Sequence, residues 1–398
     1  MTSVLSSVEP LLVAAFWVSI GAVAYTYLGY PILAMTLARL RPRPHALPKP
    51  PTSGPVNPFP RVALIIAAHN EADVIENRVR NALALNYPPE RLQIVIASDG
   101  SDDGTAEIAR RTDPRTTVLA FPVRRGKACT LNDAVAAIDA DVLVFSDANT
   151  TMDQDAIRRL VRWFADDQVG VVCGRLVVTK GPSDRNMDGA YWSFETSLKA
   201  AESRLGGLLG ANGAIYAMRR SLFSPLAPDT IVDDFVAPLT ARLRTGCRIL
   251  FDPDATAHEA AAPSIAAEFR RRVRIGAGAW QSLRVLWPLL SPAWGWTAVA
   301  LWSHKVMRWA CPLLMLTALA TSVLLSHKPL FAAAAGAQLL AITICLIALA
   351  LPGRARLPRP VRLGAMFAAM NAALLVGLFR YLSGPSTGIW KRTPRTAP

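Results

Sequence analysis

The fold is decided by residues 61–105, RVALIIAAHNEADVIENRVRNALALNYPPERLQIVIASDGSDDGT. Residues 62–68 and 92–97 are short apolar runs rich in branched side chains, which predicts buried strands. Residues 71–85, with Asn70 as the cap, and residues 103–111 are predicted helices. The alternation continues with a strand at 118–121, a helix at 127–138 and a strand at 142–145. This pattern predicts an α/β domain with a mostly parallel sheet and helices on both faces.

Polar residues follow three of the predicted strands. They lie in residues 67–71 (AAHNE), 98–105 (SDGSDDGT) and 146–149 (SDAN). Parallel strands bring their carboxyl ends to one edge of the sheet, and ligands of such sheets bind beyond that edge. We therefore expect a ligand site where these carboxylates meet.

Outside this region the chain has the pattern of a membrane protein. Residues 10–38 carry no charge, are long enough to span a bilayer, and are followed by Arg39, Arg41 and Arg43. This predicts an uncleaved signal anchor whose carboxyl end is cytoplasmic. Residues 309–327, 329–353 and 363–379 are three further candidate spans, and the arginine-rich loop at 354–362 should be cytoplasmic.

Residues 285–302 are also uncharged, but they contain two prolines and four tryptophans. Because Trp prefers the membrane interface, we expect interfacial helices on the inner leaflet there. The resulting topology is one span, a cytoplasmic domain and three spans, which leaves Lys391, Arg392 and Arg395 outside. The predicted segments are an N-terminal transmembrane helix at 1–41, a Pro-rich linker at 42–60, the α/β domain at 61–280, interfacial helices at 281–304 and C-terminal transmembrane helices at 305–398.

Composition excludes several classes of protein. With 52% hydrophobic and 18% charged residues, the chain as a whole is not intrinsically disordered. The net charge of +14 arises largely beside the apolar runs, which favours a membrane surface over nucleic acid. None of the five cysteines forms a CxxC pair, so neither a disulfide framework nor a zinc site is expected. A channel or transporter is disfavoured because the candidate spans contain almost no ionisable residues.

From about residue 61 to 287 the sequence resembles the membrane-bound branch of the family 2 glycosyltransferases. That branch includes cellulose synthase-like, hyaluronan synthase-like and poly-N-acetylglucosamine synthase-like enzymes. The resemblance rests on these segments in this order: AAHNEADVIENRVRNALALNYP, IVIASDGSDDGT, RRGKACTLNDAV, FSDANT, GANGAIYAMRR, TIVDDF and RRRVRIGAGAWQ. It implies a Rossmann-like GT-A domain that faces the cytoplasm from the inner (plasma) membrane, between one N-terminal and about three C-terminal transmembrane helices. It also implies inverting transfer of a sugar from a UDP-sugar donor.

The resemblance assigns the donor site to particular residues. Asp99 matches the family aspartate that contacts the nucleobase, while His69 and Glu71 lie in the loop that surrounds the nucleoside. Lys127 would meet the diphosphate, as basic side chains commonly do. Arg124 and Arg125, just ahead of it, are either diphosphate ligands or solvated surface charges, and Asp102 and Asp103 are expected to cap the next helix.

Asp147 and Asn149 occupy the position of the DxD metal motif of the family. A divalent cation, Mg²⁺ or Mn²⁺, would stabilise the charge that develops on the leaving diphosphate. Asp147 is the direct candidate ligand, whereas the amide of Asn149 can coordinate but adds no charge. The alternative is that Asp147 merely caps the turn after its strand.

The catalytic candidates are Asp234 and Arg274. Asp234 matches the acidic TED-type motif and would be the general base for the acceptor hydroxyl, although Asp233 beside it, or helix capping by both, is an alternative. Arg274 matches the Arg of the QxxRW motif and would pair with the leaving diphosphate. Arg271 stands in place of the Gln and Ile275 in place of the Trp, which disfavours polymer synthesis through a membrane channel.

Other basic and small residues near these motifs allow two interpretations each. Residues 270–272 suit a basic helix near anionic lipid headgroups. Residues 210–214 (GANGA) are either an acceptor contact or a tight turn, and His258 and Glu259 either border the acceptor or are structural.

The leading hypothesis is extension of a saccharide or glycolipid at the inner membrane face. The alternatives are transfer of a single sugar to a polyprenyl phosphate or lipid-linked acceptor, and a catalytically silent nucleotide- or glycan-binding partner in a secretion complex. The expected partners are therefore the donor, a saccharide or lipid-linked acceptor and membrane lipid, with secretion-complex proteins under the last alternative and without nucleic acid.

Overall fold

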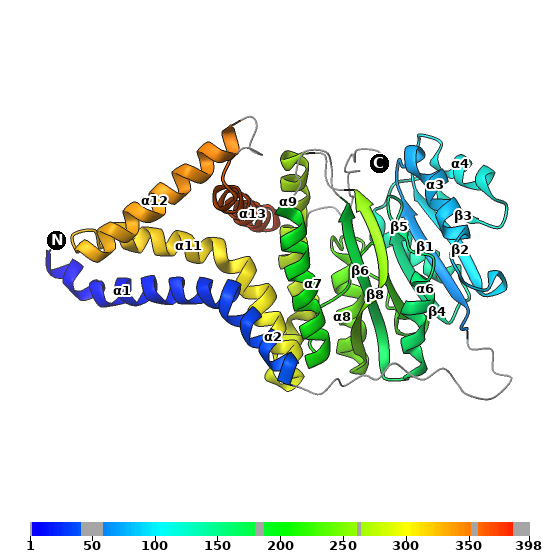
Figure 1. Ribbon diagram of the computed structural model, residues 1–398, viewed down its shortest axis with the longest axis horizontal. Helices are drawn as coiled ribbons and strands as arrows, with labels where there is room; N and C mark the ends of the chain where they lie inside the picture. The colour runs from blue at the N-terminus through cyan, green and yellow to red at the C-terminus, as the bar shows by residue number, and fades with distance from the viewer. Residues whose placement is uncertain (1, 41–58, 180–186, 261–263, 352–356, 385–398) are drawn as a thin grey trace.

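The computed structural model describes residues 2–40, 59–179, 187–260, 264–351 and 357–384. Figure 1 shows a sheet domain with its helices at one end of the molecule and long helices extending from the other end. The described strands form an eight-stranded sheet in the order β3-β2-β1-β4-β7-β6-β8-β5. Their bounds are β1 Val62–Ala68, β2 Leu92–Asp99, β3 Thr117–Phe121, β4 Val142–Asp147, β5 Thr151–Met152, β6 Val169–Thr179, β7 Tyr216–Arg219 and β8 Arg248–Ala260.

The first four strands are mutually parallel, as the sequence predicts, and β7 runs antiparallel to both β4 and β6. Strand β1 is buried along its whole length because helices cover both faces of the sheet. Its odd-numbered residues pack towards α5, α7 and α8, and its even-numbered residues towards α3 and α6. These helices are α3 Ala72–Leu83, α4 Thr105–Thr112, α5 Lys127–Ala136, α6 Ala156–Val161, α7 Met187–Leu205 and α8 Asp233–Thr245.

The start of α3 differs from the expectation. The helix begins at Ala72, and Asn70 does not cap it but adopts a positive φ of 54° and donates through its side chain to Asp102 Oδ1 at 2.8 Å. The Ala72 N–H instead donates to Asp103 Oδ2 at 3.0 Å. Asp103 also accepts the Thr105 N–H at 3.0 Å. One carboxylate from the loop after β2 thus accepts a free backbone N–H at the start of α3 and another at the start of α4.

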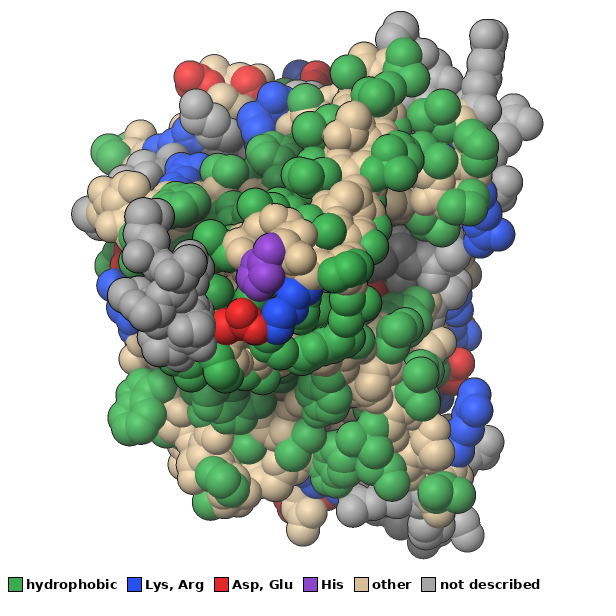
Figure 2. Space-filling model, turned by 90° about the vertical axis from the view of Figure 1, so that its left-hand side faces the viewer, with side chains coloured by type: hydrophobic (Ala, Val, Ile, Leu, Met, Phe, Trp, Pro, Cys, Tyr) green, Lys and Arg blue, Asp and Glu red, His purple; other side chains and the backbone are tan. Residues whose placement is uncertain are grey.

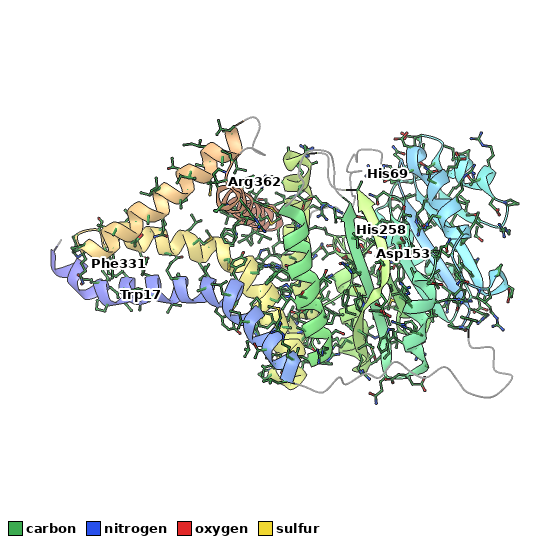
Figure 3. The ribbon with its side chains drawn as sticks, viewed as in Figure 1. Trp17, His69, Asp153, His258, Phe331 and Arg362 are labelled. Atoms are coloured by element: carbon green, nitrogen blue, oxygen red, sulfur yellow. The ribbon has the colours of Figure 1, made fainter. Side chains whose placement is uncertain are left out.

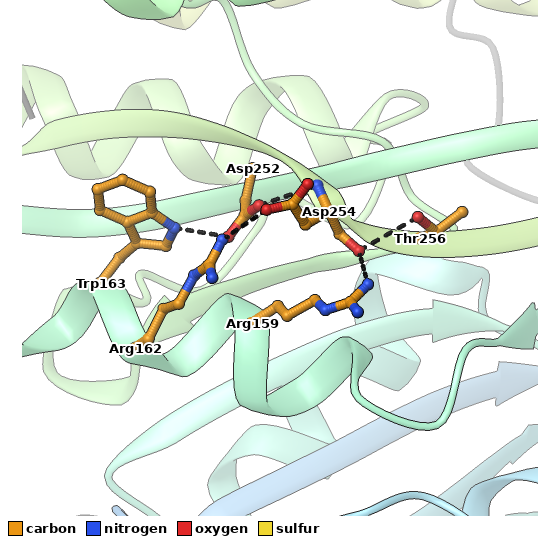
Figure 4. Close-up of polar contacts among 6 residues, drawn as sticks. All are labelled: Arg159, Arg162, Trp163, Asp252, Asp254 and Thr256. Carbon is orange, nitrogen blue, oxygen red and sulfur yellow. Dashed lines mark hydrogen bonds and ion pairs between the residues drawn. The ribbon is translucent and has the colours of Figure 1, made fainter. Parts of the chain in front are cut away.

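Strand β8 contains a bulge that its sequence explains. Its register with β6 passes from Asp252 to Thr256, skipping the segment that contains Pro253, which cannot donate to the ladder. Figure 4 shows how side chains hold this bulge against α6 and the 3₁₀ turn after it. The fully buried Asp252 accepts hydrogen bonds from Trp163 Nε1 at 2.7 Å and Arg162 Nε at 3.0 Å, and Arg159 donates to the Asp254 carbonyl.

Four described helical stretches are long and apolar enough to cross a membrane: Val8–Leu40, Trp296–Leu324, Pro329–Ala350 and Arg359–Leu382. This confirms the expected arrangement of one N-terminal and three C-terminal candidate helices. Short π-helical segments join the elements within the first two. The elements are α1 Thr2–Ala24, α2 Tyr30–Leu40, α10 Trp296–Ala300, α11 Met307–Leu324, α12 Pro329–Ala350 and α13 Arg359–Leu382.

The predicted interfacial pair at 285–302 is not a separate unit. Helix α9, Ile265–Leu286, is followed by 3₁₀ turns at Trp287–Leu290 and Pro292–Trp294, and the next long helix already begins at Trp296. That helix therefore includes His304, Lys305 and Arg308, which the predicted span at 309–327 left out. The expectation of candidate spans with almost no ionisable residues is wrong for this helix.

The long helices pack together through apolar contacts. Phe16 of α1 meets Phe331 of α12 with ring centroids 5.1 Å apart, and Figure 3 shows Trp17 beside Phe331 at this end. Figure 2, which faces the same end, shows a largely apolar surface interrupted by a small charged group. Such a surface suits contact with lipid better than contact with water.

Candidate active site

A cavity of about 720 Å³ opens beyond the carboxyl ends of β1 and β4. Its charged lining includes five of the predicted residues, namely Glu71, Lys127, Asp147, Asp234 and Arg274, together with the predicted amide of Asn149. The sheet edge, the start of α5, the start of α8 and the middle of α9 supply them. The structure thus brings most of the predicted site into one space.

Lys127 is the central cation of this cavity. Its Nζ donates to Asp147 Oδ1 at 2.9 Å and lies 3.5 Å from Asp233 Oδ2. Burial lowers the pKa of Lys127, but the charges of Asp147, Asp233 and Asp234 outweigh it and hold that pKa above its usual value. The ammonium is therefore charged, and it keeps several carboxylates close together.

The two adjacent aspartates of α8 have different surroundings. Asp234 Oδ2 accepts the Gly213 N–H at 2.9 Å, and the Asp234 carbonyl accepts the Ala211 N–H at 2.8 Å. The Asp233 carboxyl is only 9% exposed, and its Oδ2 accepts no hydrogen bond from the described residues. Burial, together with the charges of Asp234 and Asp147, raises the pKa of Asp233 to about 6 despite Lys127.

Gly213 lies between the charged groups. A Cβ at this position would lie 3.4 Å from Asp234 Oδ2, 3.5 Å from Lys127 Nζ and 3.7 Å from Asp147 Oδ2. The predicted GANGA segment is a tight turn, with Gly210 at a φ of +73° and an isolated bridge between Asn212 and Ile215. It is also a wall of the cavity, and the predicted acceptor contact stays a prediction.

The predicted metal ligands are Asp147 and Asn149, and both line the cavity. Lys127 occupies Oδ1 of Asp147, while Oδ2 faces Gly213. No group of three or more His, Cys, Asp or Glu side chains that could hold a metal occurs in the described part of the chain. One carboxylate and one amide oxygen fit a cation such as Mg²⁺, which keeps water and takes further ligands from substrate phosphates.

Asp99 and His69 lie outside the cavity lining. Asp99 is fully buried, and its two carboxylate oxygens accept the N–H groups of Arg125 at 2.8 Å and Gly126 at 2.9 Å. His69 Nδ1 lies 2.7 Å from the Asp99 carbonyl oxygen. These bonds fix the loop that begins α5 and hence position Lys127. The predicted nucleobase contact of Asp99 stays a prediction.

Arg274 reaches the cavity from α9, where burial lowers the pKa of its guanidinium although Asp233, Asp147 and Asp234 oppose this. Arg271 and Arg272 also line the cavity, and both pair with Glu268 at 2.9 Å and 2.7 Å. The charges of these two arginines are thus directed to the cavity and to Glu268. The interpretation of residues 270–272 as a basic surface for lipid headgroups stays a prediction.

His258 and Glu259 have separate surroundings. His258 Nε2 lies 2.9 Å from Asp153 Oδ1, and Figure 3 shows the two residues side by side at the sheet. Glu259 accepts the Thr150 hydroxyl at 2.8 Å and lines the cavity. The structural interpretation suits His258, whereas Glu259 borders the site.

Sequence reasoning missed the contribution of the long helices to the cavity. Trp309 of α11 packs against Phe235, with ring centroids 6.1 Å apart, and against Trp280 at 6.0 Å. Helix α7 adds Glu195 and Lys199, the π-helical segment Leu301–Val306 adds Lys305, and the start of α11 adds Arg308. Only the packing of α9, α11 and α13 against one another shows that these side chains face the site.

Comparison with known proteins agrees with this geometry. Residues 63–226 match the family model described as Glycosyl transferase family 2. Over 231 residues the chain is 27% identical to the poly-beta-1,6-N-acetyl-D-glucosamine synthase of Staphylococcus aureus (strain MSSA476), with 54% of each chain covered. It is 26% identical over 234 residues to the protein named "Probable glycosyltransferase YdaM" of Bacillus subtilis (strain 168), with 55% of each covered. The matched region thus spans about half the length of these relatives.

A solved structure matches most of the molecule. It is the mannosyltransferase PcManGT from Pyrobaculum calidifontis in complex with GDP-Man and Mn²⁺. The TM-score is 0.69 at 24% sequence identity, and the match covers 92% of this chain and 99% of that one. This likeness shows the fold. Residues 63–226 are thus a family 2 glycosyltransferase domain, and the chain is similar to the poly-beta-1,6-N-acetyl-D-glucosamine synthases.

Proposed function

We propose that this enzyme transfers a sugar, with inversion, from a UDP-sugar to a hydroxyl of a saccharide or glycolipid at the cytoplasmic face of the inner membrane. The observation that carries the proposal is the cavity in which Lys127, Asp147 and Asp234 surround Gly213. A diphosphate leaving group and an acceptor hydroxyl need a cation and a carboxylate within a short distance of each other. The poly-beta-1,6-N-acetyl-D-glucosamine synthases among the relatives support this class of product.

The reaction is a single displacement. The acceptor oxygen forms a bond to the anomeric carbon, its proton passes to the Asp234 carboxylate, and the bond between the anomeric carbon and the diphosphate oxygen breaks. The nucleoside diphosphate leaves with that electron pair, facing Lys127 and Arg274. A divalent cation at Asp147 and Asn149 would add positive charge at the leaving diphosphate. Water is displaced by the apolar side chains of the cavity.

Transfer of one sugar to a lipid-linked acceptor is a second candidate. One observation favours it: α13 supplies apolar side chains to the same cavity as the carboxylates, so a lipid chain can reach the site. Ile275, where processive relatives carry Trp, also lines the cavity. Product length separates this candidate from extension of a polymer.

The first test is release of nucleoside diphosphate by the detergent-purified chain, with UDP-sugars and GDP-mannose, with and without Mg²⁺ or Mn²⁺. In Asp234→Asn the amide oxygen still accepts the Gly213 N–H, so the loop should keep its shape. We expect turnover to fall by about 10²–10⁴-fold while nucleotide binding persists. Asp139→Asn is the matched control, because Asp139 is 83% exposed and pairs with Arg61 near the amino ends of β1 and β4.

Wild-type turnover in Asp234→Asn would contradict the assignment of the base. A chain that neither binds nor cleaves any of these donors would contradict the enzyme proposal as a whole. Donor binding without turnover would instead support a silent nucleotide-binding partner. The metal series tests Asp147 and Asn149 independently, because turnover that ignores added cation and chelator would exclude them as ligands.

A further inference from the structure

Lys305 is a cation for which the proposed transfer reaction has no role. It lies in the π-helical segment Leu301–Val306, immediately before α11, and it lines the active-site cavity. Its Nζ lies 6.0 Å from the centroid of the Phe235 ring. With the residues that the structure describes, Lys305 makes no hydrogen bond and no ion pair. A cation enclosed in this way without a partner is costly, so an anion is expected to join it.

The neighbouring carboxylates are already engaged. Glu195 Oε1 accepts from Arg308 at 2.6 Å, and Glu202 Oε1 accepts from Tyr30 at 2.8 Å and lies 2.7 Å from His304 Nδ1. Arg308 holds the pKa of Glu195 well below its usual range, although burial alone would raise it. Lys199, the other lysine on this side, donates to Asn212 Oδ1 at 2.5 Å. Lys305 thus stays available for a ligand.

The wall beside Lys305 is apolar and belongs to the long helices. Helix α13 lines the cavity with Leu363, Met366, Phe367, Met370 and Leu374. Trp309, one turn after Lys305, completes this side. A ligand that satisfies both features carries an anionic group on an apolar chain, which is the chemistry of a lipid phosphate.

The position of Lys305 also fits an acceptor rather than a donor. Phe235, over which its ammonium lies, directly follows the proposed base Asp234. The donor diphosphate is served by Lys127 and Arg274, and Lys127 is bonded to Asp147. We propose that Lys305 binds the phosphate of a lipid-linked saccharide acceptor, with the lipid chain against α13 and a sugar hydroxyl at Asp234. This inference rests on the proposed function, because it names the acceptor of that reaction.

The test is binding of defined lipids to the full-length chain in a neutral detergent, measured by native mass spectrometry. The probes are an isoprenyl phosphate, the matching isoprenol, phosphatidic acid and inorganic phosphate. We expect the wild type to retain the isoprenyl phosphate about tenfold or more better than the isoprenol, and Lys305→Met to lose that preference, since a hydrogen bond to a charged group is removed. Lys305→Arg should restore it.

Lys328→Met is the matched control, because Lys328 pairs with Glu9 in the turn between α11 and α12, outside the cavity lining. Nucleotide binding, measured on every variant, shows that the fold is intact. Equal binding of phosphate and alcohol, or wild-type binding by Lys305→Met, would overturn the inference. Retention of inorganic phosphate alone would indicate a site for a free anion and overturn the lipid assignment, and a preference for phosphatidic acid would overturn the lipid-linked saccharide.

Failure of the proposed function gives a different result. A chain that retains the isoprenyl phosphate through Lys305 but transfers no sugar keeps the lipid site and contradicts the transferase proposal. A chain that transfers sugar but retains the isoprenyl phosphate no better than the isoprenol keeps the transferase proposal and contradicts the lipid site. The two sets of measurements therefore report on the two proposals separately.

Discussion

Asp233 and Asp234 follow one another at the start of α8, yet only Asp234 accepts a hydrogen bond from the loop that lines the cavity. Burial, together with the charges of Asp234 and Asp147, raises the pKa of Asp233 to about 6 although Lys127 opposes this. A carboxyl whose pKa is raised on folding favours the protonated form in the folded chain. The protonated Asp233 carboxyl therefore adds to the free energy of unfolding below about pH 4, and this stabilisation is lost as the pH rises through about 6.

Asp233→Asn keeps this position neutral at every pH. We compare the thermal unfolding midpoint of this variant with that of the wild type. The difference, variant minus wild type, should increase by a few degrees from about pH 4.5 to about pH 7.5, which corresponds to roughly 2 kcal/mol of unfolding free energy. Midpoints should be compared at one heating rate in one detergent. A difference that is the same at both pH values, or one that Asp139→Asn reproduces, would contradict the raised pKa of Asp233.

Much of the site could be predicted at this scale. Carboxylates that follow β1 and β4 were predicted because parallel strands bring such positions to one edge, whereas Lys127, which begins α5, was predicted from the family resemblance. The relation of Asp233 to Asp234 could not be predicted, since it depends on which carboxyl meets the Gly213 N–H. That the carboxylate of Asp99 accepts the Arg125 and Gly126 N–H groups could not be predicted either, because only tertiary geometry shows it.

Helices α9 and α13 pack so closely that glycine is required between them. A Cβ on Gly377 would lie 2.8 Å from the Val273 carbonyl oxygen and 2.9 Å from the Ala277 nitrogen, both backbone atoms of α9. Around Gly336 of α12, in contrast, a Cβ would meet no atom within 4 Å. The two glycines sit in similar helices and differ in what surrounds them.

Gly377→Ala should therefore push α13 away from α9, at a cost of about 1–3 kcal/mol, and lower the thermal midpoint. Gly336→Ala should leave the midpoint unchanged or raise it, because Ala favours a helix by up to about 1 kcal/mol over Gly. Since α13 forms the apolar wall of the cavity, Gly377→Ala should also reduce sugar transfer more than nucleotide binding. Equal midpoints for the two variants would show that the contact tolerates a methyl group.

Elements were predictable where burial follows a simple pattern. Strands β1 to β4 are apolar runs with helices between them, and the bounds of β1 were predicted to the residue. Strand β7 has only four residues, and β8 is interrupted by Asp252 and Pro253, so neither gave a clear signal. The start of the α10–α11 helix was missed because His304, Lys305 and Arg308 interrupt its apolar pattern. Only tertiary contacts show that His304 and Arg308 meet carboxylates of α7 and that Lys305 lines the cavity.

At the scale of the whole molecule, a buried polar network joins the long helices to the sheet domain. Tyr30 of α2 donates to Glu202 of α7, and the same carboxylate oxygen lies 2.7 Å from His304 Nδ1. Arg308 then bridges His304 and Glu195. Long helices that precede and follow the sheet domain thus both contact α7. The transferase domain and the long helices build the cavity jointly, which positions the site at the membrane.

Helix α13 does not follow the direction of its neighbours. Figure 1 shows α1, α11 and α12 along their lengths but α13 nearly end-on, beside α9. Basic residues stand at both of its ends, with Arg359 and Arg362 at the start and Arg380 near the end. A long helix with this charge pattern that packs on the transferase domain suits the membrane surface, where it would keep both ends on one side. The basic residues 391–395 would then share the side of the transferase domain.

We therefore expect the carboxyl end of α13 on the same side of the membrane as the transferase domain, opposite the turn between α11 and α12. Ser383→Cys and Ser326→Cys report on these two positions, and both serines are exposed. In intact cells a membrane-impermeant maleimide should label Ser326→Cys only, whereas after lysis it should label both. Labelling of Ser383→Cys in intact cells would mean that α13 crosses the bilayer and that the tail lies outside, as hydropathy alone predicts. The lipid chain proposed for the cavity depends on this outcome, because a surface helix would open the site to the adjacent leaflet whereas a spanning helix would enclose it.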